Sequence, residues 1–381
     1  MEELKDLREK IDAIDQQMVD LFKQRMEVSK EVAAYKQANG LPTQDVGRER
    51  SLLAKVGERA GDELADYTQS VYRTILAAGR SYQNACSGVT SKVYETIRKA
   101  LDTTPDLFPQ RATVACQGVE GAYSQIACDS IFKAPTILYF NTFEHVFKAV
   151  ESGMCQYGVL PIENSTAGSV LKVYELMVKH KFSIVRALRL KIDHNLLVKK
   201  GVKLAEISEV ISHEQAIGQC GAFLQSMGEV KITACANTAM AAKMVAESER
   251  RDIAALSSAV CAEKYGLDVL RQSVQDQENN YTRFICISKE LEIYPRADKM
   301  SVMLILKHRP GALYEVLAKF AEFNINLTKI ESRPIAEREF EFRFFLDLDC
   351  PEYSDKVAQL LNDLQKQNEV CSFLGLYTEV K

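Results

Sequence analysis

The sequence lacks several features that would place it in a specialised class of protein. Its start, Met1-Glu2-Glu3-Leu4-Lys5-Asp6, has no apolar segment, so no signal peptide is expected. No apolar run approaches the ~20 residues that a membrane span needs. The net charge is −4, which gives no basic footprint for nucleic acid. We therefore expect a cytoplasmic protein that binds neither membranes nor nucleic acid.

Motifs for metals and nucleotides are also missing. The ten cysteines are scattered singly, without a C-x-x-C pair, which argues against a zinc site and indicates buried thiols in a reducing compartment. There is no P-loop and no short-period repeat. We expect no metal and no cofactor. With 381 residues, 46% hydrophobic and 26% charged, the composition is that of a globular protein with two or three domains.

Residues 4–36 have the pattern of one long helix. Apolar side chains recur at spacings of three and four and form a heptad seam, made by Leu4, Leu7, Ile11, Ile14, Met18, Leu21, Val28, Val32 and Tyr35. Arg25 occupies a core position of this seam, where a charge is costly unless it is paired. Arg8 and Lys36 flank the seam. Two interpretations are open: a coiled coil whose register Arg25 fixes, or a cationic ligand site.

Helix geometry decides what such a site would require. At a rise of about 1.5 Å per residue, Arg25 and Lys36 lie roughly 16 Å apart, and Arg8 and Lys36 roughly 42 Å apart. One helix cannot place all three cations on one small ligand. An antiparallel partner helix would bring the Arg8 of a second copy near Lys36 and Arg25 of the first. If these residues form a site, the helical region is an intertwined dimer.

The helical region resembles a known family. The segments LREKIDAIDQQMVDLFKQR, YK at 35–36 and DVGRERSLL, with a helix beginning near Asp45 and another over about 62–82, resemble the all-helical chorismate mutase domain. The resemblance implies that residues 1–90 form this domain. It implies catalytic roles for Arg25, Lys36, Glu49 and Gln83, and substrate contacts for Arg8, Asp45 and Arg48. Gly79 stands where the family usually has Ser.

The implied chemistry suits these side chains. Chorismate is a dicarboxylate that must fold before it rearranges, and three cations can clamp both carboxylates in that shape. The breaking ether oxygen gains negative charge, which Lys36 and Gln83 would stabilise as donors. Glu49 would orient the substrate hydroxyl.

Residues 91–110 contain a short helical stretch among turn-forming residues and read as a linker. From Arg111 the pattern changes to strand–helix alternation. Strands at about 112–116, 157–160 and 210–212 each lead into a polar turn and a helix. Helix starts capped by Ser, Thr and Asn in two successive α/β lobes suit a carboxylate-bearing ligand in a cleft between the lobes.

Thr282 and Arg283 stand at the mouth of a buried strand, Phe284-Ile285-Cys286-Ile287. A hydroxyl and a guanidinium there are well placed to meet a small anion. Because the chain returns from the second lobe near residue 270, this strand is predicted to belong to the first lobe. Thr282 would then lie at the hinge of the cleft.

The same region resembles a second family. The segments GVEGAYS, YGVLPIENSTAGS, SHEQAIGQC, ANTAMAA and YTRF resemble prephenate dehydratase, which implies a two-lobed α/β domain, similar to periplasmic binding proteins, over residues 111–290. The resemblance implies that Thr282 is catalytic. It implies substrate contacts from Tyr123, Ser124, Asn164, Ser165, Thr166, Ser212, Gln215, Asn237, Thr238, Arg283 and Phe284. Ala122 replaces a family hydroxyl residue.

The implied reaction removes the ring hydroxyl and the ring carboxylate of prephenate and gives phenylpyruvate. An isolated Thr hydroxyl is a poor acid at neutral pH, so we expect Thr282 to donate a hydrogen bond to the leaving hydroxyl. Arg283 meets either a substrate carboxylate or a structural carboxylate, and both alternatives are open.

The last region, residues 299–381, follows the order βαββαβ of a ferredoxin-like α+β fold. The segment RPGALYEVLAKFAEFNINLTKIESRP resembles an ACT regulatory domain. The resemblance implies that phenylalanine binds at an interface between two such domains. The residues near it would be Gly311, Ala312, Leu313, Glu331, Ser332 and Arg333, and small residues there let a ligand approach the backbone.

The order mutase, dehydratase and regulator is that of bifunctional enzymes of phenylalanine biosynthesis. It implies chorismate and prephenate as substrates, L-phenylalanine as inhibitor, and a homodimer or tetramer. Two alternatives are a regulated dehydratase whose mutase fold only dimerises, and a non-catalytic amino-acid sensor. A sensor needs neither Arg25 in an apolar seam nor Thr282 with Arg283 at a hinge.

Overall fold

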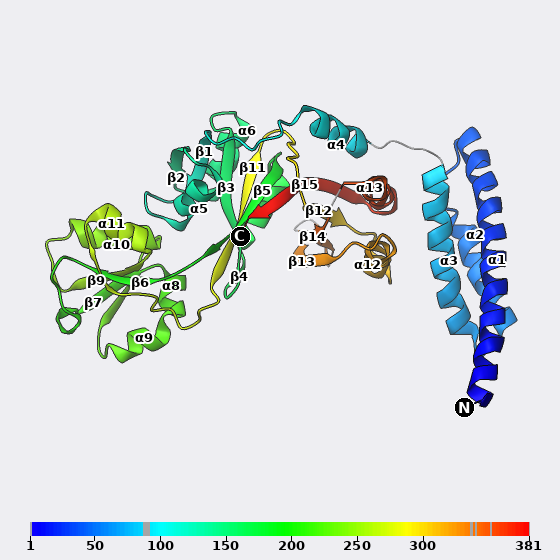
Figure 1. The fold of residues 1–381 in the computed structure, drawn as a ribbon, viewed down its shortest axis with the longest axis horizontal. Helices are drawn as coiled ribbons and strands as arrows, with labels where there is room; N and C mark the ends of the chain where they lie inside the picture. Colours follow the sequence, from blue (N-terminus) through cyan, green and yellow to red (C-terminus); the bar gives the residue numbers. More distant parts are fainter. Residues whose placement is uncertain (1, 87–91, 336–337, 340, 351–352, 381) are drawn as a thin grey trace. The chain divides into compact units, whose positions relative to one another are not determined.

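The structure is a computed structural model that describes residues 2–86, 92–335, 338–339, 341–350 and 353–380. The chain forms two compact units (Figure 1). The first comprises Met1–Glu95 and Ser354–Gln367, and the second comprises Thr96–Tyr353 and Asn368–Lys381. The predicted boundary at residues 90 and 91 lies outside the described residues, and the predicted domain limits remain predictions. Every helix in the described ranges is too short or too polar to cross a membrane.

The first unit is helical, as predicted. Its helices are α1 (Glu2–Ala38), α2 (Val46–Ala60), α3 (Ala65–Cys86) and α13 (Asp355–Gln367). Asp45 caps α2 as expected, because its side chain accepts a hydrogen bond from Arg48 N at 2.9 Å. Gly61 ends α2 with φ of 74°, a conformation that glycine adopts without strain. Helix α3 contacts both α1 and α2.

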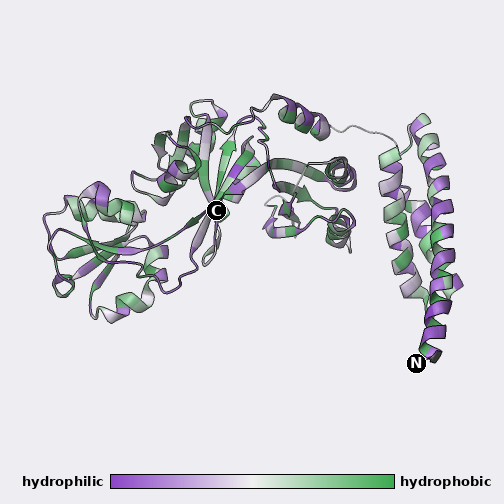
Figure 2. Ribbon diagram, viewed as in Figure 1, coloured by the Kyte–Doolittle hydropathy of each residue, from purple (hydrophilic) through white to green (hydrophobic). Residues whose placement is uncertain are grey.

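The apolar seam of α1 is exposed in this single chain. Leu7, Ile11 and Ile14 are 51%, 56% and 56% exposed, and hydrophobic residues recur along the helix in Figure 2. A contiguous apolar face of this length is uncommon on an isolated soluble chain. Within the described residues, the seam therefore has no cover from its own chain over its first half.

Helix α13 packs against α3, which the sequence did not predict. The carboxylate of Asp363 is fully buried and accepts hydrogen bonds from Ser81 Oγ at 2.9 Å and Asn84 Nδ2 at 2.8 Å. A buried carboxylate is tolerated only with such partners. On the apolar side, α13 buries Leu360 and Leu364.

The second unit contains the two α/β lobes. Helix α4 (Lys92–Thr103) is the short helix expected within the linker. The first lobe has β1 (Thr113–Gln117), β2 (Thr136–Phe140), β3 (Tyr157–Asn164), β4 (Gly168–Ser169), β5 (Ser183–Lys191) and β11 (Tyr281–Ser288), with helices α5 (Tyr123–Ile131), α6 (Phe143–Glu151) and α7 (Leu171–Lys179). Strand β11 lies between β5 and β3, which confirms that the strand after Thr282 returns to the first lobe.

Strand β3 is longer than predicted. The expected end at Leu160 is wrong, because β3 continues through Pro161 to Asn164 and turns back into the short β4. The proline lacks an N–H donor, and the ladder with β11 shifts register between Arg283 and Phe284, next to Pro161. The predicted loop is therefore a hairpin that extends the sheet to Asn164.

The second lobe has a five-stranded sheet in the order β10-β6-β9-β7-β8. Its strands are β6 (Asn195–Val198), β7 (Glu209–Ser212), β8 (Lys231–Ala234), β9 (Ile253–Ser257) and β10 (Asp268–Arg271). Its helices are the 3-10 turn η1 (Leu204–Glu206), α8 (Glu214–Gln219), α9 (Gly221–Ser226), α10 (Thr238–Glu247) and α11 (Ala259–Tyr265).

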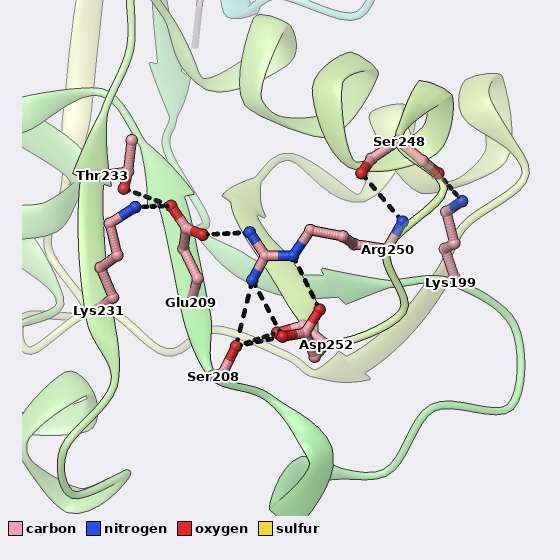
Figure 3. A network of polar contacts seen from close by, with 8 residues as sticks. All are labelled: Lys199, Ser208, Glu209, Lys231, Thr233, Ser248, Arg250 and Asp252. Carbon is pink, nitrogen blue, oxygen red and sulfur yellow. Dashed lines mark hydrogen bonds and ion pairs between the residues drawn. The ribbon is translucent and has the colours of Figure 1, made fainter.

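An ion-pair network joins β7 and β8 to the segment before β9 in the second lobe (Figure 3). Glu209 accepts hydrogen bonds from Thr233 at 2.6 Å, Lys231 at 2.9 Å and Arg250 at 2.6 Å. Arg250 also pairs with Asp252 at 3.0 Å. The hydrogen bonds to Glu209 lower the pKa of its carboxyl to about 2, and the bond from Thr233 makes the largest contribution.

The elements after residue 298 follow the predicted βαββαβ order. They are β12 (Lys299–Ile305), α12 (Ala312–Glu322), β13 (Leu327–Pro334), β14 (Phe342–Asp349), α13 and β15 (Val370–Val380), and the sheet order is β13-β14-β12-β15. Strand β15 continues alongside β5 as a parallel neighbour, so one sheet joins these strands to the first lobe. Gly375 permits this, because a Cβ there would lie 2.1 Å from Ile184 O.

Candidate functional site

Thr282 and Asn164 face each other across neighbouring strands. They are in register between β11 and β3, and Asn164 Nδ2 donates a hydrogen bond to Thr282 Oγ1 at 3.0 Å. The Thr282 oxygen is therefore an acceptor. No acceptor for its own hydrogen is seen among the described residues. A hydroxyl held in this way can present its hydrogen to a ligand.

Asn164 organises the turn that follows it. Its Oδ1 accepts hydrogen bonds from Thr166 N, Thr166 Oγ1 and Ala167 N at 3.1, 2.7 and 2.9 Å. Its Nδ2 also donates to Asn280 Oδ1 at 2.8 Å. An Asn side chain that bonds the backbone two and three residues on closes a tight turn. Asn164 is only 5% exposed, so these bonds satisfy a buried amide.

A cavity of about 310 Å³ opens beside this turn. Its wall comes from the first lobe, from α8 of the second lobe and from the segment between β10 and β11. The lining residues are Thr166, Ala167, Gln215, Gly218, Gln219, Gln275, Asp276, Gln277 and Asn280. This volume fits a small molecule. The wall is rich in carboxamides, which can both donate to and accept from a polar ligand.

Three predicted contacts belong to this site. Thr166 and Gln215 line the cavity. Ser165 lies beside them, where its hydroxyl donates to Asn279 O and accepts from Tyr281 N, both at 2.9 Å. Ser165 thus ties the Asn164 turn to the start of β11.

Sequence reasoning missed Gln219, Asn280 and His194. Gln219 Nε2 donates to Thr166 Oγ1 at 2.6 Å, and its Oε1 accepts from Asn280 Nδ2 at 2.9 Å. His194 Nε2 lies 3.0 Å from the same Oε1. Gln219 lies in SHEQAIGQC and Asn280 directly precedes YTRF, two segments that carry the family resemblance, and that was the available signal. His194 stands alone between two strands, and no local pattern marks it.

Other predicted contacts lie elsewhere in the lobes. The Ser212 hydroxyl is fully buried and donates to Leu256 O at 2.7 Å, and Asn237 caps α10 by accepting from Met240 N at 2.8 Å. Thr238 begins that helix. Tyr123 donates to Asp193 O at 2.6 Å, and burial raises the pKa of its phenol. Ser124 is buried in the first turn of α5, and Phe284 belongs to the core of the first lobe.

Arg283 is bound to carboxylates of β14 and β15. Its Nη1 lies 2.5 Å from Asp347 Oδ2, its Nε lies 2.8 Å from Glu379 Oε2, and its Nη2 donates to Tyr377 Oη at 2.9 Å. The side chain is 11% exposed. Of the two alternatives for Arg283, the structure shows a guanidinium that binds structural carboxylates. The guanidinium does not line the cavity.

Part of the predicted mutase site is assembled in the first unit. Arg25 Nη1 is buried and has no hydrogen-bond partner among the described residues. A Cβ at Gly79 would lie 3.2 Å from this nitrogen, so the glycine leaves room beside the cation. Gln83 lies one turn further along α3. Lys36 Nζ donates to Thr43 O at 2.6 Å.

Glu49 is held by a residue that sequence reasoning missed. Arg80 Nη1 lies 2.6 Å from Glu49 Oε1, and Gln44 Nε2 donates to Glu49 Oε2 at 3.1 Å. Asp45 serves as the cap of α2, and Arg48 is exposed in its first turn. Arg8 is exposed on the first turns of α1, 17 residues before Arg25 and so roughly 26 Å from it along the helix. The structure does not bring Arg8 to the others within one chain.

The predicted effector residues surround the start of α12 and the end of β13. Gly311 precedes α12 with φ of 82°, and Ala312 and Leu313 begin the helix. Glu331, Ser332 and Arg333 lie on β13. Glu331 Oε2 accepts a hydrogen bond from Ser169 Oγ of the β3–β4 hairpin at 2.7 Å, and Glu331 lies 3.9 Å from Arg333.

Comparisons with known proteins cover each region. The family models for chorismate mutase type II, prephenate dehydratase and the ACT domain match residues 7–84, 114–292 and 300–365. Arogenate dehydratase 2 of Petunia hybrida is 37% identical over 284 residues, which are 70% of this chain and 72% of that protein. A solved structure of prephenate dehydratase in complex with L-Phe from Arthrobacter aurescens has 27% identity and a TM-score of 0.63, and it covers 70% of this chain and 90% of that one.

Some relatives match almost end to end. The bifunctional chorismate mutase/prephenate dehydratase of Enterobacter agglomerans is 31% identical over 383 residues, which cover 97% of this chain and 95% of that protein. In this chain the three matched regions occur in the order chorismate mutase, prephenate dehydratase and ACT domain. This chain belongs to the family of bifunctional chorismate mutase/prephenate dehydratases with a C-terminal ACT domain.

Proposed function

We propose that the chain rearranges chorismate to prephenate in its helical unit and converts prephenate to phenylpyruvate at the cavity beside the Asn164 turn, whose amide bonds Thr282. L-Phenylalanine inhibits the enzyme through the ACT domain. The observation that carries the second activity is the hydrogen bond from Asn164 to Thr282, because it leaves the Thr282 hydrogen available to a ligand.

In the dehydratase step, prephenate loses CO₂ and its ring hydroxyl. The C–C bond to the carboxylate breaks, its electron pair completes the aromatic ring, and the C–O bond breaks. The departing oxygen takes up a proton from solvent and leaves as water. Thr282 donates a hydrogen bond to this oxygen as it gains negative charge. The polar wall around Asn164 and Gln219 holds the substrate in place.

In the mutase step, no covalent intermediate is needed. Arg25 and Lys36 bind the substrate carboxylates with Arg8, and Arg48 adds positive charge. Lys36 and Gln83 stabilise the ether oxygen, and Glu49, fixed by Arg80, orients the ring hydroxyl. The buried Arg25 Nη1 without a partner supports this role, because a desolvated guanidinium favours an anionic ligand.

The mutase site contains residues of two chains. Arg8 and Arg25 are too far apart on one helix, and the exposed apolar seam of α1 provides a surface for an antiparallel second copy. Pairing of this kind buries Leu7, Ile11 and Ile14 and delivers the second Arg8. The assembly is therefore a homodimer at the least, and a tetramer of two such dimers is equally compatible.

Inhibition acts on the hairpin that carries Asn164. Ser169 donates to Glu331, and Lys329 pairs with Glu163 at 2.9 Å, so β13 contacts both sides of the Asn164 turn. A ligand that rearranges Glu331 and Arg333 alters these contacts. Effector binding and dehydratase activity are then coupled through the hairpin.

Arogenate is a second candidate substrate for the same cavity. Arogenate carries an ammonium group at the carbon where prephenate carries a keto group, next to the same carboxylate. The dehydratase of Petunia hybrida named above is an arogenate dehydratase. The carboxylate of Asp276 lies in the cavity wall. A carboxylate favours the substrate ammonium group. D276N should lower kcat/KM for arogenate more than for prephenate, and an equal loss for both would remove this candidate.

The ten cysteines are free, and we assign the protein to a reducing compartment, the cytoplasm.

The test of the main proposal is an assay of the purified protein with chorismate or prephenate, without added cofactor. Phenylpyruvate should form from both substrates, and phenylalanine should suppress it. Product from prephenate alone would leave the helical unit as a dimeriser, and no product from either would favour the amino-acid sensor.

A further inference from the structure

One side chain, Gln219, contacts both chain crossings between the lobes. It lies at the end of α8 in the second lobe. His194 lies on the crossing from β5 to β6, and Asn280 lies on the return to β11. Both donate to Gln219 Oε1, at 3.0 and 2.9 Å, while Gln219 Nε2 reaches Thr166 of the first lobe at 2.6 Å.

A series of hydrogen bonds begins at His194, and the chemistry of the groups fixes the direction of each bond in it. A carboxamide oxygen only accepts, so His194 Nε2 must carry the hydrogen in its contact with Gln219 Oε1. The amide nitrogen of Gln219 then donates to Thr166 Oγ1. Since the Thr166 oxygen accepts there, its hydrogen goes to Asn164 Oδ1 at 2.7 Å.

The chain of hydrogen bonds ends at the reacting hydroxyl. With its oxygen satisfied by Thr166, Asn164 turns its amide nitrogen to Thr282 Oγ1 at 3.0 Å. Each bond thus runs toward Thr282, which leaves the Thr282 hydrogen for the substrate. Hydrogen bonds aligned in one direction polarise one another, which makes the last hydroxyl a better donor.

The surroundings of His194 are suited to a fixed neutral donor. The residue is 3% exposed, and its Nδ1 is buried without a hydrogen-bond partner among the described residues. Its backbone N–H donates to Gln275 Oε1 at 2.9 Å, and its ring stands edge-on to Tyr123 with centroids 6.1 Å apart. Burial lowers the pKa of the imidazole. The ring is therefore held in one orientation with the hydrogen on Nε2.

We infer that His194 and Gln219 are positioning residues of the dehydratase, which orient the hydrogen of Thr282 toward the substrate through Thr166 and Asn164. Neither touches the reacting atoms in this arrangement, and no proton moves along the chain. The inference rests on the proposed dehydratase activity. It adds a specific requirement, a donor at the position of His194 Nε2.

The decisive comparison is H194Q against H194F in the full-length protein. Gln can place an N–H near the position of Nε2, whereas Phe fills the space without a donor. We expect H194F to lower kcat on prephenate by about 10- to 100-fold with KM within about 3-fold. H194Q should recover most of this loss. Thermal unfolding and binding of phenylalanine report whether each variant retains its fold.

A second pair of variants tests Gln219. Q219E keeps the shape but replaces the donor by an acceptor, so Thr166 must turn its hydrogen away from Asn164, and kcat should fall. Q277E places the same charge in the same cavity wall. It should raise KM for an anionic substrate without the loss of kcat, because Gln277 has no place in the chain of hydrogen bonds.

The outcomes separate this inference from the proposed function. A wild-type protein that forms no phenylpyruvate from prephenate contradicts the proposed function itself. An active wild type with H194F equally active, or with H194Q as impaired as H194F at unchanged stability, overturns the donor role of His194. Equal losses of kcat in Q219E and Q277E would assign the effect to charge and overturn the role of Gln219.

Discussion

Thr282 and Arg283 are neighbours in the chain, yet their side chains leave β11 on opposite faces. Thr282 meets Asn164, and Arg283 meets Asp347 and Glu379. Side chains alternate along a strand, so a hydroxyl and a guanidinium in sequence cannot both face one ligand. One strand thus joins the candidate dehydratase site on one side to β14 and β15 on the other.

Removing the Thr282 hydroxyl tests the first of these roles. We expect T282A to lower dehydratase kcat by about 10²- to 10³-fold, because the leaving oxygen loses its donor. T282S keeps the hydroxyl and should retain more activity than T282A. Mutase activity on chorismate, measured in the same samples, should stay unchanged. A T282A protein with near-normal dehydratase kcat would end the assignment.

Arg283 should matter for stability more than for substrate binding. R283M leaves the carboxylate of Asp347 without its cation and removes one of the two cations of Glu379, which also pairs with Arg189 at 2.6 Å. Both carboxylates are nearly buried, with side chains 13% and 4% exposed. Loss of one partner from a buried ion pair costs about 3–5 kcal/mol in the free energy of unfolding. Urea unfolding of the full chain measures this, and D347N in the R283M background should recover part of the loss. A lower stability without any rise in KM is expected, and a large rise in KM at unchanged stability would return Arg283 to the substrate.

The sequence was sufficient for the elements and their order, because each carried a local signal. The heptad spacing of 4–36 predicted α1, and the apolar run Phe284-Ile285-Cys286-Ile287 predicted β11. Asn164, Thr166 and Gln215 were found because they lie in segments that resemble the family. Local pattern does not contain the direction in which a side chain points. The Ser212 hydroxyl bonds a strand and Asn237 caps a helix, and their contacts with substrate remain predictions.

Contacts between distant segments were beyond reach. His194 meets Gln219 across 25 residues, and Asp363 meets Ser81 across 282. Such pairs are set by how whole elements pack, and each member alone is an ordinary surface or core residue. Pro161 lies inside β3 for a related reason: its missing N–H coincides with the register shift in the ladder with β11, a contact between distant segments.

Gly311 provides a test of effector binding that leaves both sites intact. Its φ of 82° is strained for any other residue, and a valine there also places a branched side chain at the start of α12. G311V should lose inhibition by phenylalanine while it keeps dehydratase activity. A matched variant, G228V, places the same residue at another glycine with φ of 78° and should retain inhibition. Unchanged inhibition in G311V would count against the predicted effector site.

Stability of the second lobe should depend on pH through Glu209. Folding lowers the pKa of this carboxyl from 4.5 to about 2. Its contribution to stability is therefore complete above pH about 4.5 and is lost as the pH falls toward 2. E209Q should be less stable than wild type at pH 7, and the difference should shrink as the pH falls through this range. Urea unfolding at several pH values measures it, with E214Q on the exposed first turn of α8 as control. A constant difference would contradict the role of the charge.

The arrangement of the mutase site across two chains can be tested by mixing inactive variants. R8A and R25A alone should each lose about 100-fold or more in mutase activity, since each removes a cation from every site. In a random mixture, half of the dimers contain one chain of each kind. Such a dimer has one doubly mutated site and one intact site, so about 25% of wild-type activity should return. R25A mixed with K36A should show no recovery, because both residues serve the site from the same chain. No recovery in the first mixture would place Arg8 in the site of its own chain or outside it. Recovery in the control would place Arg25 and Lys36 of one chain in different sites. Dehydratase activity reports the amount of folded protein in every sample.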